Sequence, residues 1–248
     1  MSMTERKEKW FETWFDTSYY HILYQNRDFV EAERFITNLL AFLKLPAGSN
    51  CLDLACGKGR HSVFLNKHGL KVTGVDLSEN SINEAKPFEN ETLTFDVHDM
   101  RTVYKKNEYD TVFNLFTSFG YFDDYEDNLK VLNSVNEMLV AGGQLVIDFM
   151  NADFVLDHLV KEEEKTMAGI KFHITRNYDG SHIFKNIHFT DKGKEFNFQE
   201  KVQAIKKEEF EDLLEKAGFE VQHVFGDFSL AQFDRSKSDR LIIIAEKK

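Results

Sequence analysis

A turn of small residues directly after a short apolar run is the feature of this sequence best suited to chemistry. The run covers residues 50–55 and carries an acid, Asp53. The small residues of the turn are Ala55, Gly57 and Gly59, and a helical pattern starts at about Arg60. Glycine is needed where the backbone adopts a positive φ or lies against a ligand with no Cβ between them. The pattern therefore predicts a buried strand, a tight turn and a helix N-terminus that together hold a ligand.

A second acid stands near the end of the next predicted strand. Residues 71–77 form that strand, and Asp76 is close to its carboxyl end. A glycine turn followed about 20 residues later by an acid is typical of a nucleoside site, in which the acid accepts hydrogen bonds from ribose hydroxyls. The alternative is that Asp76 caps the short helix predicted after Ser78.

The charge near the turn indicates which kind of nucleoside binds. A dinucleotide site prefers Gly-x-Gly-x-x-Gly, and here the last place is taken by Ser62. A carboxylate at Asp53 would repel a pyrophosphate, but it suits a ligand with a positive end. S-adenosylmethionine has such an end, formed by an α-ammonium group and a sulfonium. The alternative role for Asp53 is that of a structural acid that orients the turn.

With this motif the sequence resembles the class I S-adenosylmethionine-dependent methyltransferases. Their first motif is an acid followed by a turn of small residues and glycines, and it reads Asp53-Leu-Ala55-Cys-Gly57-Lys-Gly59 here. The first turn glycine of the family pattern is Ala55 in this chain, so we expect the backbone at that position to avoid a positive φ. Segments 95–100, 109–116 and 141–148 resemble later motifs of the family, in the same order.

The resemblance also implies roles for individual residues. Asp99 and Met100 would address adenine and Leu77 would pack on it, while backbone carbonyls at 114–116 would lie near the ammonium group. The alternatives are a solvated loop acid at position 99 and a core role for Leu77. The implied cofactor-binding residues are Asp53, Ala55, Cys56, Gly57, Asp76, Leu77, Asp99, Met100, Asn114, Leu115 and Phe116.

Candidates for catalysis come from two aromatic segments. Tyr121 and Phe122 follow the predicted strand 110–115, where aromatic faces would attract a sulfonium. Tyr20 and His21 belong to an aromatic N-terminal segment, and a histidine there can act as a base near neutral pH. The catalytic candidates are therefore Tyr20, His21 and Tyr121. The alternatives are a terminal helix docked for stability and the hydrophobic start of a helix. Asp148, at the end of strand 144–149, would either touch the substrate or hold the insertion described below.

The order of elements predicts an α/β fold of the Rossmann-like, doubly wound type. Strands near 50–55, 71–76, 92–96, 110–115 and 144–149 alternate with helices, which implies a parallel sheet covered on both faces. Helix 125–139 is expected to end at Gly142. Two more strands, 219–225 and 241–245, complete a seven-stranded sheet. The resemblance implies that the last strand is antiparallel.

Between residues 161 and 205 the hydrophobic period changes to two. Asp179-Gly180 predicts a two-residue hairpin turn that would set Phe172 opposite Ile187 and Ile170 opposite Phe189. A second turn at 191–193 leads to a third strand, so we expect a three-stranded antiparallel meander. Its apolar face must cover either the core or a substrate cavity. The charged run 161–165 is expected on the solvated surface.

The N-terminal region is predicted to be helical. Trp10 and Trp14, like Phe11 and Phe15, are four residues apart and therefore share a helical face. The expected organisation is an N-terminal helical lid or cover over residues 1–45, a Rossmann-like S-adenosylmethionine-binding domain over 46–160 and 206–248, and an antiparallel insertion over 161–205.

Composition excludes several partners. The net charge is −11, so nucleic acid is not an expected partner. The sequence has no membrane-length apolar run and no apolar signal segment at its N-terminus, so we expect no membrane partner and a cytoplasmic location. Cys51 and Cys56 are expected to be reduced. No metal site is expected, since the three histidines of the meander, at 173, 182 and 188, fall on its polar face.

These observations predict S-adenosylmethionine-dependent methyl transfer to the oxygen, nitrogen or carbon of a small molecule, by a monomer or a homodimer. One alternative is a nicotinamide-dependent oxidoreductase, against which Ser62 and Asp53 count. The other is a non-catalytic S-adenosylmethionine-binding module, which turnover of labelled cofactor would exclude.

Overall fold

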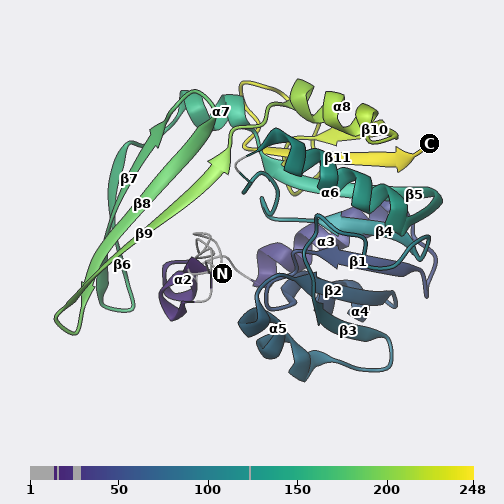
Figure 1. Cartoon of the computed structure of the whole chain (residues 1–248), viewed down its shortest axis with the longest axis horizontal. Coiled ribbons are helices and arrows are strands. Elements are labelled where there is room, and N and C mark those ends of the chain that lie inside the picture. Colours follow the sequence, from purple (N-terminus) through teal and green to yellow (C-terminus); the bar gives the residue numbers. More distant parts are fainter. Residues whose placement is uncertain (1–13, 16, 25–28, 123) are drawn as a thin grey trace, which may run out of the picture.

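A twisted seven-stranded sheet forms the larger part of the molecule (Figure 1). The computed structural model describes residues 14–15, 17–24, 29–122 and 124–248. The strand order is β10-β11-β5-β4-β1-β2-β3, and β11 runs antiparallel to both of its neighbours. The strands are β1 (Asn50–Leu54), β2 (Lys71–Asp76), β3 (Leu93–Val97), β4 (Tyr109–Asn114), β5 (Leu139–Met150), β10 (Phe219–Phe225) and β11 (Arg240–Lys247). The predicted Rossmann-like fold with an antiparallel last strand is confirmed.

Helices cover both faces of this sheet, because its central strands are apolar on both sides. One face packs against α6 (Tyr125–Met138) and α8 (Lys207–Lys216). The other packs against α3 (Phe29–Leu43), α4 (Arg60–Lys67) and α5 (Glu79–Ala85). A short helix, α7 (Ala152–Asp157), follows β5, and the 3-10 turn η1 (Lys86–Phe88) follows α5. None of the helices in the described part of the chain is long and apolar enough to cross a membrane.

The boundary between α6 and β5 differs from the expectation. The helix ends at Met138 and β5 begins at the next residue, so Gly142 lies within the strand and does not end the helix. Tyr109 pairs with Leu139 and Thr111 with Gln144, which leaves residues 140–143 as a bulge. Gly142 has a φ of 71° within this bulge, which is the conformation that glycine allows without strain.

The insertion forms a second, antiparallel sheet of four strands, where three were expected (Figure 1). Its strands are β6 (Glu162–Met167), β7 (Ile170–Tyr178), β8 (His182–Asp191) and β9 (Lys194–Gln203). The additional strand, β6, is the charged run. It pairs with β7 and forms ion pairs across it, such as Lys171 with Glu164 at 2.9 Å. An exposed, charged edge strand of this kind resists pairing with other chains.

The predicted register of the β7–β8 hairpin was wrong by two residues. Phe172 pairs with Phe189, and Ile174 pairs with Ile187. The cause is the Asp179 side chain, whose Oδ1 accepts hydrogen bonds from the backbone N–H groups of Ser181 (2.9 Å) and His182 (2.7 Å) and so widens the turn. A shift of two residues keeps every side chain on its predicted face.

The apolar face of the second sheet covers the N-terminal helix α2 (Ser18–Leu23). Trp14 and Leu23 are buried against Phe172, Ile174 and their neighbours. Trp10 and Phe11, which were predicted to share this helical face, lie outside the described residues. His182 is buried, contrary to the expected exposed position, because β8 begins where the second sheet meets the main body.

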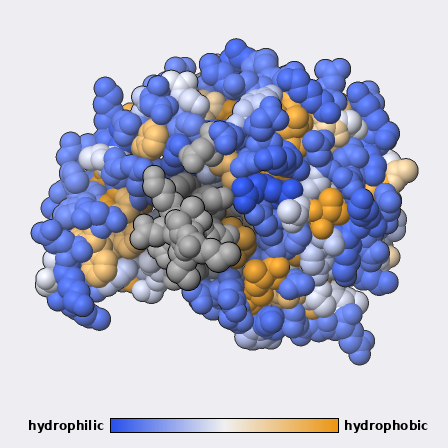
Figure 2. Space-filling view, in the orientation of Figure 1, coloured by the Kyte–Doolittle hydropathy of each residue, from blue (hydrophilic) through white to orange (hydrophobic). Residues whose placement is uncertain are grey.

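Gln203 connects the second sheet to the first. Its backbone N–H donates to Gly120 O (2.8 Å) and its side chain donates to Phe122 O (3.0 Å), while Asn128 donates to its side-chain oxygen. The join lies in the segment that follows β4. The outer surface is largely hydrophilic on the face shown in Figure 2, in keeping with the net charge of −11.

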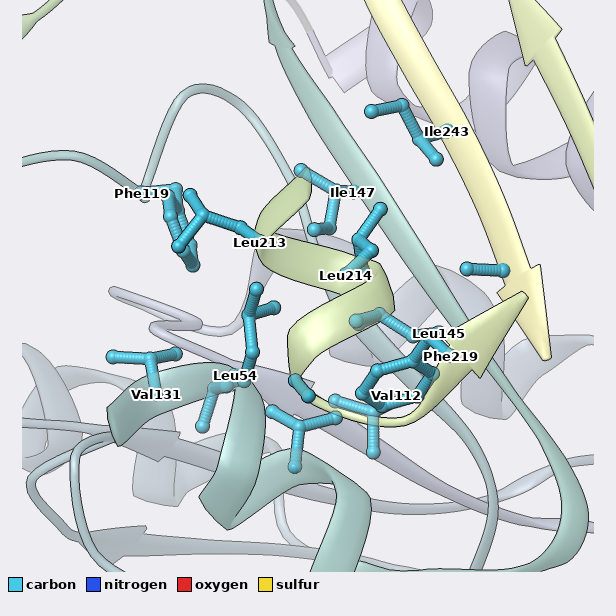
Figure 3. Packing of buried hydrophobic residues seen from close by; sticks show 14 of the residues in the cluster. Leu54, Val112, Phe119, Val131, Leu145, Ile147, Leu213, Leu214, Phe219 and Ile243 are labelled. Carbon is cyan, nitrogen blue, oxygen red and sulfur yellow. The ribbon is translucent and has the colours of Figure 1, made fainter. Parts of the chain in front are cut away.

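The packing of α8 on the first sheet can be tested by a substitution in the core. Leu214 is fully buried between α8 and the sheet, next to Leu145 and Val112 (Figure 3). We predict that Leu214→Ala lowers the free energy of unfolding by about 2–5 kcal/mol, because it leaves a cavity. Val160 is 55% exposed, and Val160→Ala should change that free energy by less than about 0.5 kcal/mol. Urea denaturation measures both, and equal effects would contradict the packing described.

Candidate functional site

A cavity of about 450 Å³ opens at the carboxyl ends of β1, β2, β3 and β4, and we call it the main cavity. In open α/β sheets ligands bind at this end of the strands. The segments that follow these four strands contribute, among others, Gly57, Leu77, Asp99 and Leu115 to its wall. Phe15 and three residues at α2, Tyr20, His21 and Tyr24, close the opposite side. The structure therefore brings together the glycine turn and the aromatic N-terminal segment.

The glycine turn is hydrogen-bonded to the end of β2. Gly57 donates its N–H to Asp76 Oδ2 at 2.8 Å, and Asp76 Oδ1 accepts from the backbone N–H of Ser78 at 2.9 Å. Gly57 has a φ of 55° and open space where a Cβ would stand. Since Gly57 lines the main cavity, the backbone there is open to a ligand. The N-cap of α5 is Ser78, whose hydroxyl accepts from Ser81 N, so the alternative cap role of Asp76 does not hold.

Ala55 departs from the expectation. Its φ is 62°, in the left-handed region that we expected it to avoid. The strain of this conformation for an L-residue is about 1–2 kcal/mol. Hydrogen bonds on either side hold the bend: Cys56 N donates to Val75 O, and Gly59 N donates to Cys56 O, both at 3.0 Å. The turn thus adopts a positive φ at position 55 without a glycine there.

Asp53 and Asn114 do not line the main cavity. Asp53 is 1% exposed and accepts a hydrogen bond of 2.5 Å from the Ser62 hydroxyl. Asn114 is 2% exposed and donates to Leu54 O at 3.0 Å, which ties the end of β4 to that of β1. Both side chains point into the layers between sheet and helices, so the contacts place them behind the site. Asp53 thus has a structural contact with Ser62, and its contact with a cofactor stays a prediction. For Asn114 the prediction concerns the backbone carbonyl, and it also stays a prediction.

Burial changes the ionisation of two groups beside the turn. It raises the pKa of the Asp53 carboxyl from 3.8 to about 6, against the opposing effect of the Ser62 hydrogen bond. Burial, together with the neighbouring positive charge of Arg60, lowers the pKa of His61 to about 3, so this side chain is neutral at physiological pH. His61 lines the main cavity. Sequence reasoning missed His61, although the first turn of a helix after a glycine bend is where a ligand-facing side chain is expected.

Leu77, Asp99 and Met100 also line the main cavity. Leu77 is 39% exposed, which excludes the alternative that it is a core residue. Asp99 is engaged by Arg101, whose Nη2 lies 2.5 Å from Asp99 Oδ2 and whose Nη1 lies 3.1 Å from Asp127. The Asp99 carboxylate is thus held in place by a cation.

A strained bend follows β4. Phe116 and Thr117 have φ values of 66° and 59°. Asp148 holds both: its Oδ2 accepts from Phe116 N at 2.8 Å and its carbonyl accepts from Thr117 N at 2.9 Å. Arg240 compensates the buried carboxylate, with Nη2 2.6 Å from Asp148 Oδ1. Asp148 therefore positions the backbone that carries the Phe116 ring. Its contacts show neither of the two expected roles, since it is fully buried and lines neither the main cavity nor the insertion.

The three catalytic candidates, Tyr20, His21 and Tyr121, all lie in the wall of the main cavity. The Phe15 ring joins them, with its centroid 4.9 Å from that of Tyr20 and 5.5 Å from that of Tyr121. Tyr24, which the sequence analysis did not single out, lines the same wall. Among the described residues, no group of His, Cys, Asp or Glu side chains is placed to hold a metal ion.

Fold and site together define a nucleoside-binding α/β protein. A family model described as "Methyltransferase domain" matches residues 24–224, so the chain belongs to the methyltransferase domain family. It is 29% identical over 217 residues, 82% of this chain and 86% of the other, to a putative methyltransferase, YqeM, of Bacillus subtilis. It is 27% identical to the dTDP-3-amino-3,4,6-trideoxy-alpha-D-glucopyranose N,N-dimethyltransferase of Streptomyces venezuelae, over 74% of this chain and 80% of that protein.

Solved structures support the fold. An S-adenosylmethionine-dependent methyltransferase from Clostridium acetobutylicum superposes with a TM-score of 0.78 at 19% identity, over 92% of this chain and 96% of that one. CalS10 of Micromonospora echinaspora, solved with S-adenosylmethionine bound, gives 0.71 at 18% identity, over 94% and 98%. The resemblance to class I S-adenosylmethionine-dependent methyltransferases is confirmed.

We predict that Asp76→Ala weakens the binding of S-adenosylhomocysteine by about 1–3 kcal/mol, because a charged acceptor of hydrogen bonds is lost. Isothermal titration calorimetry measures the dissociation constant. Asp157→Ala, at an exposed position at the end of α7, is the matched control and should leave it unchanged. An unchanged constant for Asp76→Ala would remove this carboxylate from the site.

The raised pKa of Asp53 predicts a pH dependence of stability. Between about pH 4 and 6 the unfolded chain releases this proton while the folded chain keeps it, so Asp53 costs stability as the pH rises. Asp53→Asn should therefore gain up to about 3 kcal/mol relative to wild type between pH 4 and pH 7. Urea denaturation of both proteins at each pH measures this difference. His61 gives the free energy of unfolding the opposite pH dependence, but it is present in both proteins, so its contribution cancels. The control Asp157→Asn should show no such trend, and a constant difference for Asp53→Asn would be the contrary result.

Proposed function

We propose that the main cavity binds S-adenosylmethionine and that this enzyme transfers its methyl group to a small-molecule acceptor. The observation that carries the proposal is the bend at Gly57, which opens to the cavity while Asp76 stands beside it at the end of β2. A Cβ-free backbone and a neighbouring carboxylate fit a nucleoside whose ribose has two hydroxyls to donate. The names of the relatives support a small acceptor, since one of them acts on an aminosugar nucleotide.

In this proposal each group of residues that lines the main cavity contacts one part of the cofactor. Asp76 accepts hydrogen bonds from the ribose, and the neighbouring Leu77 packs on the adenine, with Asp99 and Met100 at its edge. Ala55, Cys56 and Gly57 lie along the sugar and the amino-acid portion. Leu115 and Phe116 stand near the reacting end. The Asp53 and Asn114 side chains do not line the cavity. They form hydrogen bonds that fix the ends of β1 and β4.

The cofactor supplies an activated methyl group, and the protein supplies position and a water-poor site. Tyr20, His21, Tyr121 and Phe15 form an aromatic wall near the position proposed for the sulfonium. Aromatic faces attract a sulfonium by about 0.5–2 kcal/mol each. Because burial makes His61 neutral, no second positive charge from this side chain opposes the sulfonium.

We also propose the division of the chain given above, with residues 1–45 as a lid, 46–160 and 206–248 as the cofactor domain and 161–205 as the insertion. The separate second sheet supports it. A cytoplasmic enzyme, monomeric or homodimeric and without a nucleic-acid partner, agrees with two buried free thiols and a net charge of −11.

Two titrations test the proposed function. S-adenosylhomocysteine should bind the wild-type protein in calorimetry, and NAD should not, because a diphosphate would lie near the Asp53 carboxyl behind the turn. Release of S-adenosylhomocysteine from S-adenosylmethionine in the presence of a metabolite extract would distinguish an enzyme from a binding module. Binding of NAD without S-adenosylhomocysteine would overturn the proposal.

A further inference from the structure

A second cavity of about 220 Å³, which we call the side cavity, shares a wall with the main cavity. The residues common to both are aromatic: Phe15, Tyr20, Tyr24, Phe116 and Tyr121. Beyond this shared wall the side cavity is lined by Thr117, Met150, Glu200, Val202 and Arg240. A methyl donor in the main cavity and an acceptor in the side cavity would therefore contact the same rings, and transfer requires that the two ligands reach each other between these rings.

Glu200 is the acid of the side cavity, and neutral donors hold it. Its Oε1 accepts from Trp14 Nε1 at 2.7 Å and from the Tyr24 hydroxyl at 2.6 Å. Lys185, on the adjacent strand β8, lies 3.5 Å from its other oxygen and also donates to the Tyr24 hydroxyl. The Glu200 side chain is only 15% exposed. The carboxylate is thus fixed in orientation at the base of the side cavity.

Arg240 is the other charged group in the lining, and its counter-charge lies nearer than that of Glu200. Its guanidinium lies 2.6 Å from the buried Asp148 carboxylate and donates to the Thr117 hydroxyl at 3.1 Å. The cation nearest to Glu200 is farther away, at 3.5 Å. Because the energy between two charges falls with their separation, the charge of Glu200 is compensated less fully than that of Arg240. Aromatic rings around Glu200 add to the attraction for a cation.

We propose that the side cavity is the acceptor site and that it takes a small primary or secondary amine, with the nitrogen facing Glu200 and Tyr24. This rests on the proposed function. The amine reacts in its neutral form, after its ammonium proton has gone to solvent. Its nitrogen lone pair forms the N–C bond while the bond from that carbon to the sulfonium sulfur breaks, and sulfur keeps the electron pair. The positive charge moves from sulfur to nitrogen, and the extra proton leaves to solvent with the product.

The geometry favours nitrogen over oxygen as the acceptor atom. An amine needs a fixed negative group where positive charge develops, and Glu200 is such a group. A hydroxyl needs a base that removes its proton as the bond forms. Glu200 is a weak base for this task, since its Oε1 accepts from two donors and its Oε2 lies 3.5 Å from the Lys185 ammonium.

The test compares wild type with Glu200→Gln, Tyr24→Phe and a matched control, Glu195→Gln. Glu195 lies on the same strand, β9, but is exposed on the opposite face of the sheet. Each protein receives S-adenosylmethionine labelled in its methyl group and pairs of probes that share a carbon skeleton, such as benzylamine with benzyl alcohol and cyclohexylamine with cyclohexanol. Calorimetry with S-adenosylhomocysteine runs in parallel.

We expect label to enter amines and not alcohols, and Glu200→Gln to lower kcat/KM for amines by about 10²-fold. Tyr24→Phe should lower it too, and it serves as the second variant if Glu200→Gln fails to fold. Binding of S-adenosylhomocysteine should be unchanged in Glu200→Gln and Glu195→Gln, whose altered side chains do not line the main cavity. Methylation of alcohols alone, no methylation of any amine, or full amine turnover in Glu200→Gln and Tyr24→Phe would overturn the inference. Failure of wild type to bind S-adenosylhomocysteine would instead overturn the proposed function.

Discussion

The Asp76 carboxylate and the bend at Gly57 form the contact on which the site depends. One oxygen accepts the Gly57 N–H and the other accepts the Ser78 N–H, so a single side chain ties the end of β1 to the end of β2 and to the start of α5. A hydrogen bond to a charged group contributes about 1.5–3 kcal/mol. That range is sufficient to offset the strain of about 1–2 kcal/mol at Ala55, which has a positive φ. The same contact leaves the outer side of the bend open to the main cavity.

The first sheet was predictable because its signals are local. Each buried strand is an apolar run, each crossover is a helix with its own period, and the handedness of such crossovers leaves few arrangements. Prediction failed where a side chain or a neighbouring strand determines the structure. The β7–β8 register follows from Asp179 accepting two backbone N–H groups. The strand β6 is stabilised by pairing with β7 and has no apolar alternation of its own.

The candidate site also contains residues that the sequence located and residues whose positions only the tertiary structure reveals. Motif and order located Asp76, Gly57 and Leu77 in the wall of the main cavity, because these residues follow strand ends. They did not indicate that Asp53 and Asn114 turn away from it, since side-chain direction at a strand end depends on packing. Glu200 and Arg240 carried no signal at all. They come from segments far apart in sequence, and only the tertiary fold brings them together around one cavity.

The two sheets contribute different parts of the cavity walls. The first sheet supplies the ends of β1, β2, β3 and β4, which surround the main cavity. The second sheet supplies Glu200 and Val202 and, through its apolar face, holds α2 with Tyr20 and Tyr24. Gln203 joins the two beside the segment that carries Tyr121. Because the inserted strands and α2 form one packed cluster, changes on β8 and β9 act on the aromatic wall that both cavities share, while the glycine bend belongs to the first sheet.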